Sequence, residues 1–198
     1  MTARQHPDGR VARGQRTREA IIAAHSALLR EGELRPTGKA VAERAGVSLR
    51  TLWLNFKDIE SLLEATGRYW LDHDASSWTS VPADLALTMR IEAFCVQRAA
   101  RLEGLAPAAR SGLTSEPFSP ALRAARLQHL DRLHADLVAT FGAELGAGRD
   151  SVAHRVLFAL ANSMTWQLLR DDEGLSVEEA TDVVRHGFRL VLEAPGVS

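Results

Sequence analysis

Apolar residues recur along this chain at the spacing of α-helices, and no stretch alternates as a half-buried β-strand does. Glycines, prolines and polar clusters interrupt the pattern at intervals. It predicts helices over about residues 16–30, 58–71, 82–102, 107–113, 119–141, 150–171 and 176–193, and two shorter helices between residues 37 and 57. Residues 72–77 are polar and indicate a loop. The sequence therefore predicts an all-α fold.

Residues 37–57 combine the local signals for two short helices joined by a tight turn. Thr37 and Ser48 are good N-cap residues, and Gly46 between them suits a left-handed turn conformation. The apolar positions that would pack the two helices together are Val41, Ala42, Ala45, Leu52 and Phe56. This is the pattern of a helix-turn-helix, whose second helix enters the DNA major groove. The alternative is a corner of two helices with no ligand.

Charge is distributed unevenly along the chain. Residues 1–57 carry 11 Lys and Arg against 5 Asp and Glu, whereas residues 58–198 carry 13 against 20. A basic amino-terminal part on an acidic body indicates a polyanion partner at one end. The first arginines, Arg4, Arg10, Arg13, Arg16 and Arg18, form a sparse basic arm, and Pro7, Gly9 and Gly14 predict that its first part is disordered. The alternative is a solubilising tail.

These patterns predict three regions. Residues 1–15 are a flexible basic arm, residues 16–57 an amino-terminal three-helix DNA-binding domain with the helix-turn-helix, and residues 58–198 a carboxy-terminal helical bundle for effector binding and dimerisation.

Composition narrows the remaining possibilities. With 45% apolar residues the chain can bury a real core, and its one cysteine, Cys95, rules out a disulfide framework. No apolar run approaches the roughly twenty residues of a membrane span, and no leader opens the chain, so we expect a soluble cytoplasmic protein. Metal-ligand spacings, phosphate-binding loops and nucleophile elbows are missing, so we expect neither an enzyme nor a cofactor.

Residues 156–166 are apolar on nearly every side of the predicted helix. A helix of this kind must be covered all round, and one face is available to a partner. Small residues at Ala159, Ala161, Ser163 and Gly187 would permit close approach of helices. We expect a second copy of the chain to cover that face, since most soluble oligomers are two-fold dimers. The alternative is a central helix wrapped by its own chain.

Several polar side chains lie on stripes that otherwise face the core. Aromatic walls with a few convergent polar groups are typical of small-molecule pockets, and arginines with a histidine would suit an anionic or phenolic compound. The predicted ligand-binding residues are Trp70, Phe94, Arg98, Arg126, His129, Phe158, Asn162 and Trp166. Alternatively, the arginines form salt bridges with Glu92, Glu103 or Asp131, or extend into solvent.

The order of these features resembles the tetracycline-repressor family of bacterial transcription regulators. The resemblance rests on Thr-Arg-Glu-Ala-Ile-Ile at residues 17–22, Ala-Glu-Arg-Ala-Gly-Val-Ser at 42–48, Thr51 with Leu52, Phe56, and Glu60 with Leu62 and Leu63. It covers about residues 16–70, and beyond them only helix count and order match. It implies a homodimer paired through the last two helices, a ligand cavity in the body, and ligand binding that weakens DNA affinity.

Two positions depart from the family pattern. Trp53 stands where the family usually has a phosphate-binding tyrosine, and Ile59 stands where it usually has lysine, with Lys57 two residues earlier. Arg50 suits either guanine readout or a phosphate, and Leu54 suits a thymine methyl. The predicted DNA-binding residues are Arg13, Arg16, Thr17, Thr37, Lys39, Ser48, Leu49, Arg50, Thr51, Trp53, Leu54, Asn55 and Lys57.

The sequence thus predicts a ligand-responsive regulator, a repressor in the first instance, that binds a palindromic double-stranded DNA operator as a homodimer and is released by a small-molecule effector. One alternative is a DNA-binding dimer without a small-molecule switch. Another is a helical small-molecule-binding or enzymatic protein whose helix-turn-helix is incidental.

Overall fold

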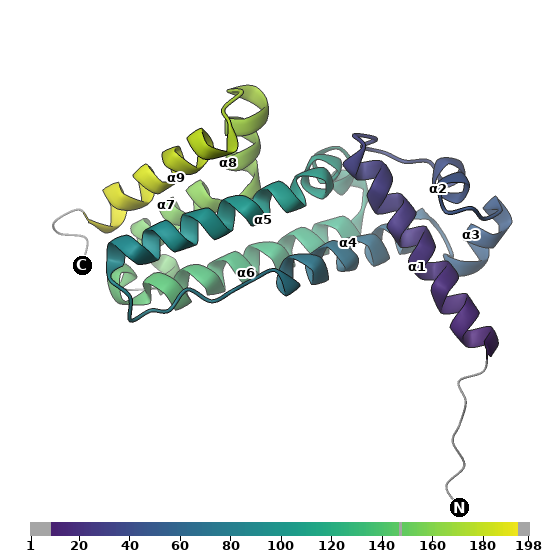
Figure 1. The fold of residues 1–198 in the computed structure, drawn as a ribbon, viewed down its shortest axis with the longest axis horizontal. Coiled ribbons are helices and arrows are strands. Elements are labelled where there is room, and N and C mark those ends of the chain that lie inside the picture. Colours follow the sequence, from purple (N-terminus) through teal and green to yellow (C-terminus); the bar gives the residue numbers. More distant parts are fainter. Residues whose placement is uncertain (1–8, 147, 194–198) are drawn as a thin grey trace, which may run out of the picture. The chain divides into compact units, whose positions relative to one another are not determined.

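A computed structural model describes residues 9–146 and 148–193 of the chain, and all regular elements in these ranges are helices (Figure 1). The α-helices are α1 (Gly9–Arg30), α2 (Gly38–Arg44), α3 (Leu49–Asn55), α4 (Ile59–Ser76), α5 (Leu87–Ser115), α6 (Pro120–Leu145), α7 (Val152–Ala161), α8 (Ser163–Gln167) and α9 (Val177–Leu192). Three short turns, η1 (Glu116–Phe118), η2 (Gly148–Asp150) and the π-helical η3 (Leu168–Asp172), join some of them. The predicted all-α fold is confirmed.

The chain divides into two compact units. Unit 1 holds Met1–Asp72 with Pro107–Ala125, and unit 2 holds His73–Ala106 with Arg126–Ser198. The dividing points fall inside α4, α5 and α6. These compact units are not the predicted functional domains, and the end of the DNA-binding domain at residue 57 stays a prediction.

Unit 1 is built on a small core shared by α1, α2, α3 and the start of α4. Its buried side chains are Ile21, Ala24, Val41, Ala42, Leu52, Phe56 and Leu62. Burying a side chain such as Leu52 or Phe56 contributes roughly 1.5–3 kcal/mol. Arg18 also holds α1 to α3, because its Nη1 donates to the Asn55 carbonyl at 2.7 Å and its guanidinium lies 4.1 Å from the centre of the Phe56 ring.

Two polar contacts complete unit 1. The Glu60 carboxylate accepts hydrogen bonds from the Ser119 hydroxyl at 2.8 Å and the Ala121 amide at 2.7 Å, so it caps the start of α6. Ser111 donates to the Leu34 carbonyl at 2.7 Å. Both contacts join residues about 60 or more positions apart, and neither has a local sequence signal.

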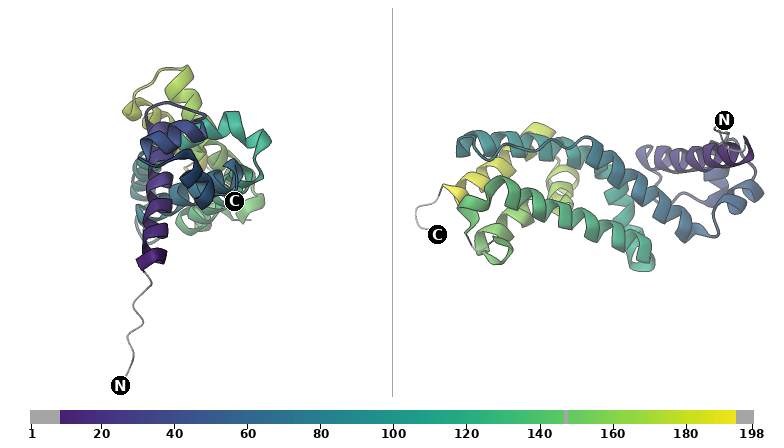
Figure 2. Two further views of the ribbon diagram at one scale, coloured as in Figure 1. Left: turned by 90° about the vertical axis from the view of Figure 1, so that its right-hand side faces the viewer. Right: turned by 90° about the horizontal axis from the view of Figure 1, so that it is seen from below.

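Unit 2 contains the larger core. Its segments of α5 and α6 run side by side, and α7 and α9 pack with them (Figure 2). Phe94 of α5, Phe141 of α6 and Phe188 of α9 form its aromatic centre, with ring centroids 5.4–5.8 Å apart. A capping box begins α9, since Ser176 and Glu179 each bond the other's backbone amide.

The observed helix boundaries differ from the sequence prediction at four places, two of which are in α1 and α4. α1 begins at Gly9 rather than near residue 16, so residues 9–15 of the predicted flexible arm are helical, while Arg4 and Pro7 lie outside the described residues. α4 continues to Ser76 through residues expected to form a loop, because Asp74 is buried against Arg101.

The other two corrections concern α5 and α7. α5 begins at Leu87 rather than Pro82, and it runs without a break through Pro107, where a new helix was expected. Proline removes one helical hydrogen bond, but the alanines on both sides of it favour helix. The helix expected over residues 150–171 is broken at Asn162, whose extended backbone ends α7 and whose side chain caps α8.

Candidate nucleic-acid interface and ligand pocket

The helix-turn-helix is locally determined. The Thr37 hydroxyl accepts the Ala40 amide at 3.1 Å, and the Ser48 hydroxyl accepts the Thr51 amide at 3.0 Å, so α2 and α3 both begin at the residues predicted to cap them. Gly46 has a φ of +67°, a conformation that other residues reach only with strain. The sharp turn it permits sets α3 across α2 over the core described above.

The outer face of α3 is unusually apolar for an exposed surface. Leu49 is 44% exposed, Trp53 38% and Leu54 73%, and Arg50 beside them is exposed too. Leu52 and Phe56 are instead buried. Contiguous exposed apolar side chains with a cation among them are typical of a surface that receives a partner. The predicted inner and outer faces of α3 are therefore placed as the period of the helix requires.

Trp53 links α3 to the start of α2. A Cβ atom placed on Gly38 would lie 2.6 Å from Cζ2 of the Trp53 ring, so the indole lies against the α2 backbone at that point. Gly38 is flanked by Thr37 and Lys39, which are both exposed. The structure thus brings together Thr37, Lys39 and Trp53, three of the predicted backbone-contacting residues.

The remaining predicted DNA-binding residues are more dispersed. Arg13 and Arg16 are exposed on α1, and the Thr17 hydroxyl donates to the Arg13 carbonyl at 3.1 Å. The Asn55 side chain donates to the Thr51 carbonyl at 2.9 Å, which uses its amide group within α3. Lys57, directly after α3, is exposed.

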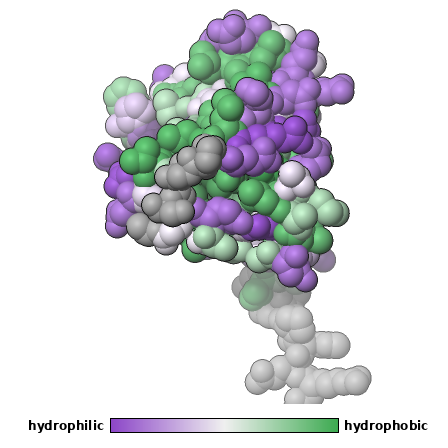
Figure 3. All heavy atoms as spheres, turned by 90° about the vertical axis from the view of Figure 1, so that its left-hand side faces the viewer, coloured by the Kyte–Doolittle hydropathy of each residue, from purple (hydrophilic) through white to green (hydrophobic). Residues whose placement is uncertain are grey.

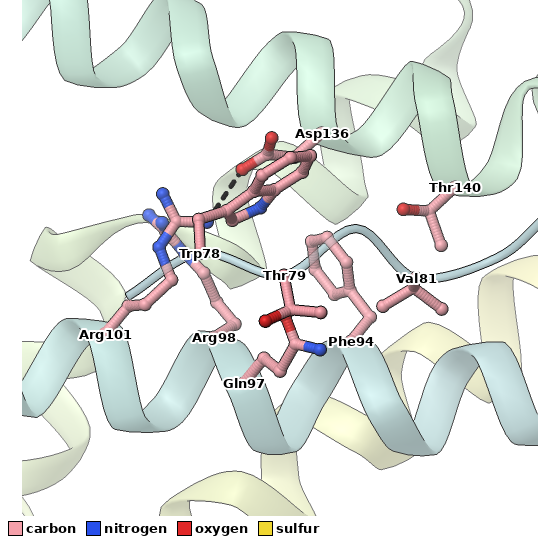
Figure 4. A pocket seen from close by; sticks show the side chains of 9 residues that line it. All are labelled: Trp78, Thr79, Val81, Phe94, Gln97, Arg98, Arg101, Asp136 and Thr140. Carbon is pink, nitrogen blue, oxygen red and sulfur yellow. Dashed lines mark hydrogen bonds and ion pairs between the residues drawn. The ribbon is translucent and has the colours of Figure 1, made fainter. Parts of the chain in front are cut away.

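A pocket in unit 2 lies between α5, α6 and the loop that joins α4 to α5 (Figure 4). It encloses about 240 Å³ of space without protein atoms, solvent at its mouth included. The lining residues are Trp78, Thr79, Val81, Phe94, Gln97, Arg98, Arg101, Asp136 and Thr140. Most of that space is open to solvent, and the enclosed part, about 10 Å³, has room for about one water molecule.

Arg101 is fully paired beside this pocket. Its Nε and Nη2 donate to the two carboxylate oxygens of Asp74 at 2.7 and 2.9 Å, and its Nη1 donates to Asp136 at 2.8 Å (Figure 4). Burial alone would raise the pKa of Asp74, but the hydrogen bonds and charge of Arg101 outweigh it, and the pKa lies below its usual value. Asp74 is therefore ionised at neutral pH.

Arg98 is buried differently, without a carboxylate in contact. It is 2% exposed; its Nε donates to the Ala161 carbonyl at 2.7 Å and its Nη2 lies 3.1 Å from Nε2 of His129. Burial and the neighbouring Arg101 lower the pKa of Arg98 to about 9, so it remains charged at neutral pH. Because a guanidinium only donates, His129 Nε2 must accept and the ring proton lies on Nδ1.

His129 is neutral in this arrangement. Burial, together with the charge of Arg98, lowers the pKa of His129 to about 4. Its Nδ1 lies 3.8 Å from an Asp74 oxygen, which is an ion pair only when the ring is protonated. At neutral pH Arg98 therefore carries the positive charge of the Arg98–His129 pair, whereas the charge of Arg101 is balanced by Asp74 and Asp136.

Comparison with known proteins identifies the fold. No protein-family model matches the chain, and no curated protein matches it. Among solved structures, the crystal structure of the multidrug binding protein EbrR complexed with imidazole matches with a TM-score of 0.62 and 21% identity, over 98% of this chain and 96% of that one. The chain has the tetracycline-repressor fold.

Within this tetracycline-repressor fold, six of the eight predicted ligand-binding residues do not line the pocket in unit 2. Only Phe94 and Arg98 do so. Trp70 packs in unit 1, with the Arg30 guanidinium 4.6 Å from its ring. Arg126 is exposed, and His129 lies behind Arg98.

The other three predicted ligand-binding residues make packing, capping and hydrogen-bond contacts within unit 2. Phe158 stacks on His134 with ring centroids 3.9 Å apart. Asn162 bonds the amides of α8 through its side-chain oxygen, and the Trp166 indole donates to Glu103 at 2.7 Å. The pocket in unit 2 therefore brings together two of the eight predicted residues, and a ligand-binding role for any of the eight stays a prediction.

Sequence reasoning missed most of the pocket lining. Trp78 and Thr79 lie in an irregular loop that has no periodic signal, and Asp136 pairs with an arginine 35 positions away. One signal was present, because Arg98 and Arg101 stand three residues apart and must share one side of a helix.

Other chemical sites are not evident in the part of the chain that the structure describes. Those residues contain no group of three or more side chains that could hold a metal ion, and no helix among them is long and apolar enough to cross a membrane. Cys95 is 2% exposed, and burial raises the pKa of its thiol to about 12, so it is a core residue rather than a nucleophile.

Proposed function

We propose that this protein is a ligand-responsive transcriptional regulator, acting as a repressor, that binds a palindromic operator as a homodimer and is released by a small-molecule effector. The observation that carries the proposal is the pair α2 and α3. Each is capped by its own N-cap residue, the two pack on a closed core, and the outer face of α3 is left exposed.

The DNA-binding mode follows from that outer face. Arg50 presents a fork of donors that matches the two acceptors of guanine, and Leu54 can contact a thymine methyl group. Thr37, Lys39 and Trp53 lie together at the start of α2, where their donors suit phosphate oxygens. Trp53 would replace the usual tyrosine hydroxyl by an indole N–H, which can also donate one hydrogen bond.

Dimerisation is supported by the outer surface of α7, α8 and α9. Exposed apolar side chains there are Val152, Val156, Met164, Val183 and Leu190, which are between 39% and 77% exposed. Hydrophobic side chains also reach the surface among hydrophilic ones at the end of the protein where α9 ends (Figure 3). A second copy of the chain would cover this surface and would give the two-fold symmetry that a palindromic operator requires.

The effector switch rests on the pocket in unit 2 and on α4. Asp74, near the end of α4, is bound by Arg101, and the loop that follows α4 supplies Trp78 and Thr79 to the pocket wall. A ligand that moves this loop would bias the position of α4, whose first part belongs to unit 1. The matched structure, EbrR, is a multidrug binding protein, which agrees with a ligand-binding role for this fold.

The second candidate is a DNA-binding dimer without a small-molecule switch. The small volume of the pocket favours it, because the enclosed space has room for about one water molecule. An enzymatic role has no supporting constellation among the described residues.

Substitutions on α3 and directly after it test the proposal. Operator fragments can be selected from random DNA with the purified protein and their affinity measured by fluorescence anisotropy. We expect Arg50→Ala to weaken specific binding by about 1–3 kcal/mol and to relax one base position. Lys57→Ala should weaken binding to all sequences alike and reduce the salt dependence by about one counterion.

Arg123→Ala is the matched control, because it removes an exposed arginine of unit 1 that lies on α6 rather than on the helix-turn-helix. Its binding isotherm should equal that of the wild type. Unchanged affinity in both the Arg50 and the Lys57 variants would mean that the motif is only structural.

A further inference from the structure

The pocket in unit 2 contains a buried positive group with one unused donor. Arg98 lines the pocket, and within the described residues its Nη1 has no hydrogen-bond partner although Nε and Nη2 each have one. A buried donor left unsatisfied costs about 1–3 kcal/mol, and more when the group is charged. This unused donor therefore marks where a ligand acceptor would be most stabilising.

The neighbouring carboxylates do not accept hydrogen bonds from Arg98. Both oxygens of Asp74 and one of Asp136 accept hydrogen bonds from Arg101. His129 accepts a hydrogen bond from Arg98 Nη2, but its ring is neutral and does not balance the positive charge of Arg98. Arg98 is thus a buried cation that has neutral groups as its direct contacts and an open position at Nη1.

The rest of the pocket is suited to a flat apolar group. Phe94 and Val81 are 6% exposed and form its inner wall, and the Trp78 ring, 39% exposed, lies across its outer side (Figure 4). Trp78 and Val81 belong to the loop between α4 and α5, where the Trp78 amide donates to the Ala75 carbonyl at 3.3 Å and the chain around Val81 is irregular. This wall can move to admit a ring more easily than a helix can.

We propose that this pocket binds a small aromatic carboxylate, whose carboxylate accepts a hydrogen bond from Arg98 Nη1 and whose ring packs between Phe94 and Trp78. This assigns a ligand class to the effector site of the proposed function, and its regulatory meaning rests on that function. The enclosed space of the pocket has room for about one water molecule, so a ring enters only when Trp78 and its loop move outward. An aromatic cation would leave Nη1 unused, and the Asp74 and Asp136 carboxylates that could attract it are already paired with Arg101.

Three ligands of nearly equal shape test the assignment on the wild-type protein. Benzoate, benzamide and benzylamine carry an anionic, a neutral and a cationic group on the same ring. Calorimetric titration should rank benzoate about ten-fold tighter than benzamide, because a charge-assisted hydrogen bond is worth about twice a neutral one, and benzylamine weakest. Benzoate should also change the tryptophan fluorescence, and Trp78→Phe should remove most of that change.

Arg98→Met removes the donor and keeps an apolar chain of similar length. In this variant benzoate should lose its ten-fold preference over benzamide. Arg155→Gln is the control, because it removes an exposed arginine of the same unit that does not line the pocket, and it should bind benzoate as the wild type does. If Arg98→Met does not fold, the wild-type ranking and the electron density of bound 4-bromobenzoate decide the question.

The proposal is overturned if benzoate binds no more tightly than benzamide or benzylamine, if none of the three binds at millimolar concentration, or if 4-bromobenzoate places its carboxylate away from Arg98. Operator binding, measured on the same samples, separates this outcome from the proposed function. A protein that binds its operator and is released by a cation would keep the function and contradict the ligand class. A protein that binds benzoate without any change in operator affinity would keep the ligand class and contradict the switch.

Discussion

At the scale of single residues, Gly38 is a position where a side chain is excluded for a reason unrelated to helix propensity. Alanine normally favours a helix over glycine by roughly 1 kcal/mol. Here the new Cβ would lie 2.6 Å from the Trp53 ring, which must move. Because Trp53 is partly exposed, it can rotate outward with little loss of folding stability. We expect Gly38→Ala to weaken operator binding several-fold in an anisotropy titration while the melting temperature stays nearly constant.

Gly104→Ala supplies the control. Gly104 lies within α5, is exposed, and has no atom within 4 Å of a Cβ placed on it. That substitution should raise stability by roughly 0.5–1 kcal/mol and leave operator affinity unchanged. Equal operator binding by Gly38→Ala and the wild type would mean that the position of the Trp53 ring does not contribute to the interface.

His25 makes the folding of unit 1 depend on pH. Burial lowers the pKa of His25 to about 4 from an ordinary value of 6.5. Between these two values the unfolded chain binds a proton that the folded chain does not, so stability is present above pH 6.5 and decreases as the pH falls toward 4. The shift corresponds to about 3 kcal/mol.

We expect His25→Leu to remove that part of the pH dependence, measured as urea midpoints by circular dichroism from pH 8 to pH 4. His129 acts in the same direction in unit 2, since its pKa is also lowered to about 4, so some dependence will remain. If the variant lost as much stability on acidification as the wild type, His25 would not be the neutral buried group that its surroundings indicate.

At the scale of helices, the sequence correctly predicted the helix ends that depend on residues close by in the chain. The caps at Thr37, Ser48 and Ser176 bond amides three residues away, so a short window contains the whole signal. The end of α4 was wrong because Asp74 is neutralised by Arg101, 27 positions later, and a polar run then remains helical. Contacts of that length have no local pattern.

The two candidate sites differ in the same way, since one depends on local sequence and the other on long-range contacts. The exposed face of α3 follows from helical period alone, so its residues could be named from the sequence. The pocket depends on how α5, α6 and a loop meet, and only Phe94 and Arg98 were found because both lie on one stripe of α5. Asn162 caps α8, a role that uses the same polar side chain as ligand binding would.

The outer surface of α7 and α9 yields a prediction for self-association. Gly187 was expected to face a partner, but a Cβ on it would lie 2.6 Å from Leu160, so it serves the packing of α9 on α7 within one chain. Val156, 39% exposed on α7, is the better probe. We expect Val156→Glu to sediment as a monomer, whereas Leu113→Glu, on an exposed part of α5 in unit 1, should remain dimeric. A dimeric Val156 variant would place the interface elsewhere.

At the scale of the whole molecule, regulation requires that the two units influence each other. Three helices, α4, α5 and α6, have residues in both units, so the chain offers continuous elements through which one unit can bias the other. A ligand can shift such an equilibrium only by its different affinity for the two states. Any coupling between the pocket and the operator site must therefore be mutual.

This reciprocity is the last prediction. If benzoate weakens operator affinity by some factor, saturating operator must weaken benzoate affinity by the same factor, and coupling of about 1–3 kcal/mol makes that factor roughly 5–150. Anisotropy titrations with and without benzoate, and calorimetry with and without operator, measure the two sides independently. Equal factors above one support a single switching equilibrium. Factors of one on both sides, with both ligands bound, would identify a DNA-binding dimer whose pocket takes no part in regulation.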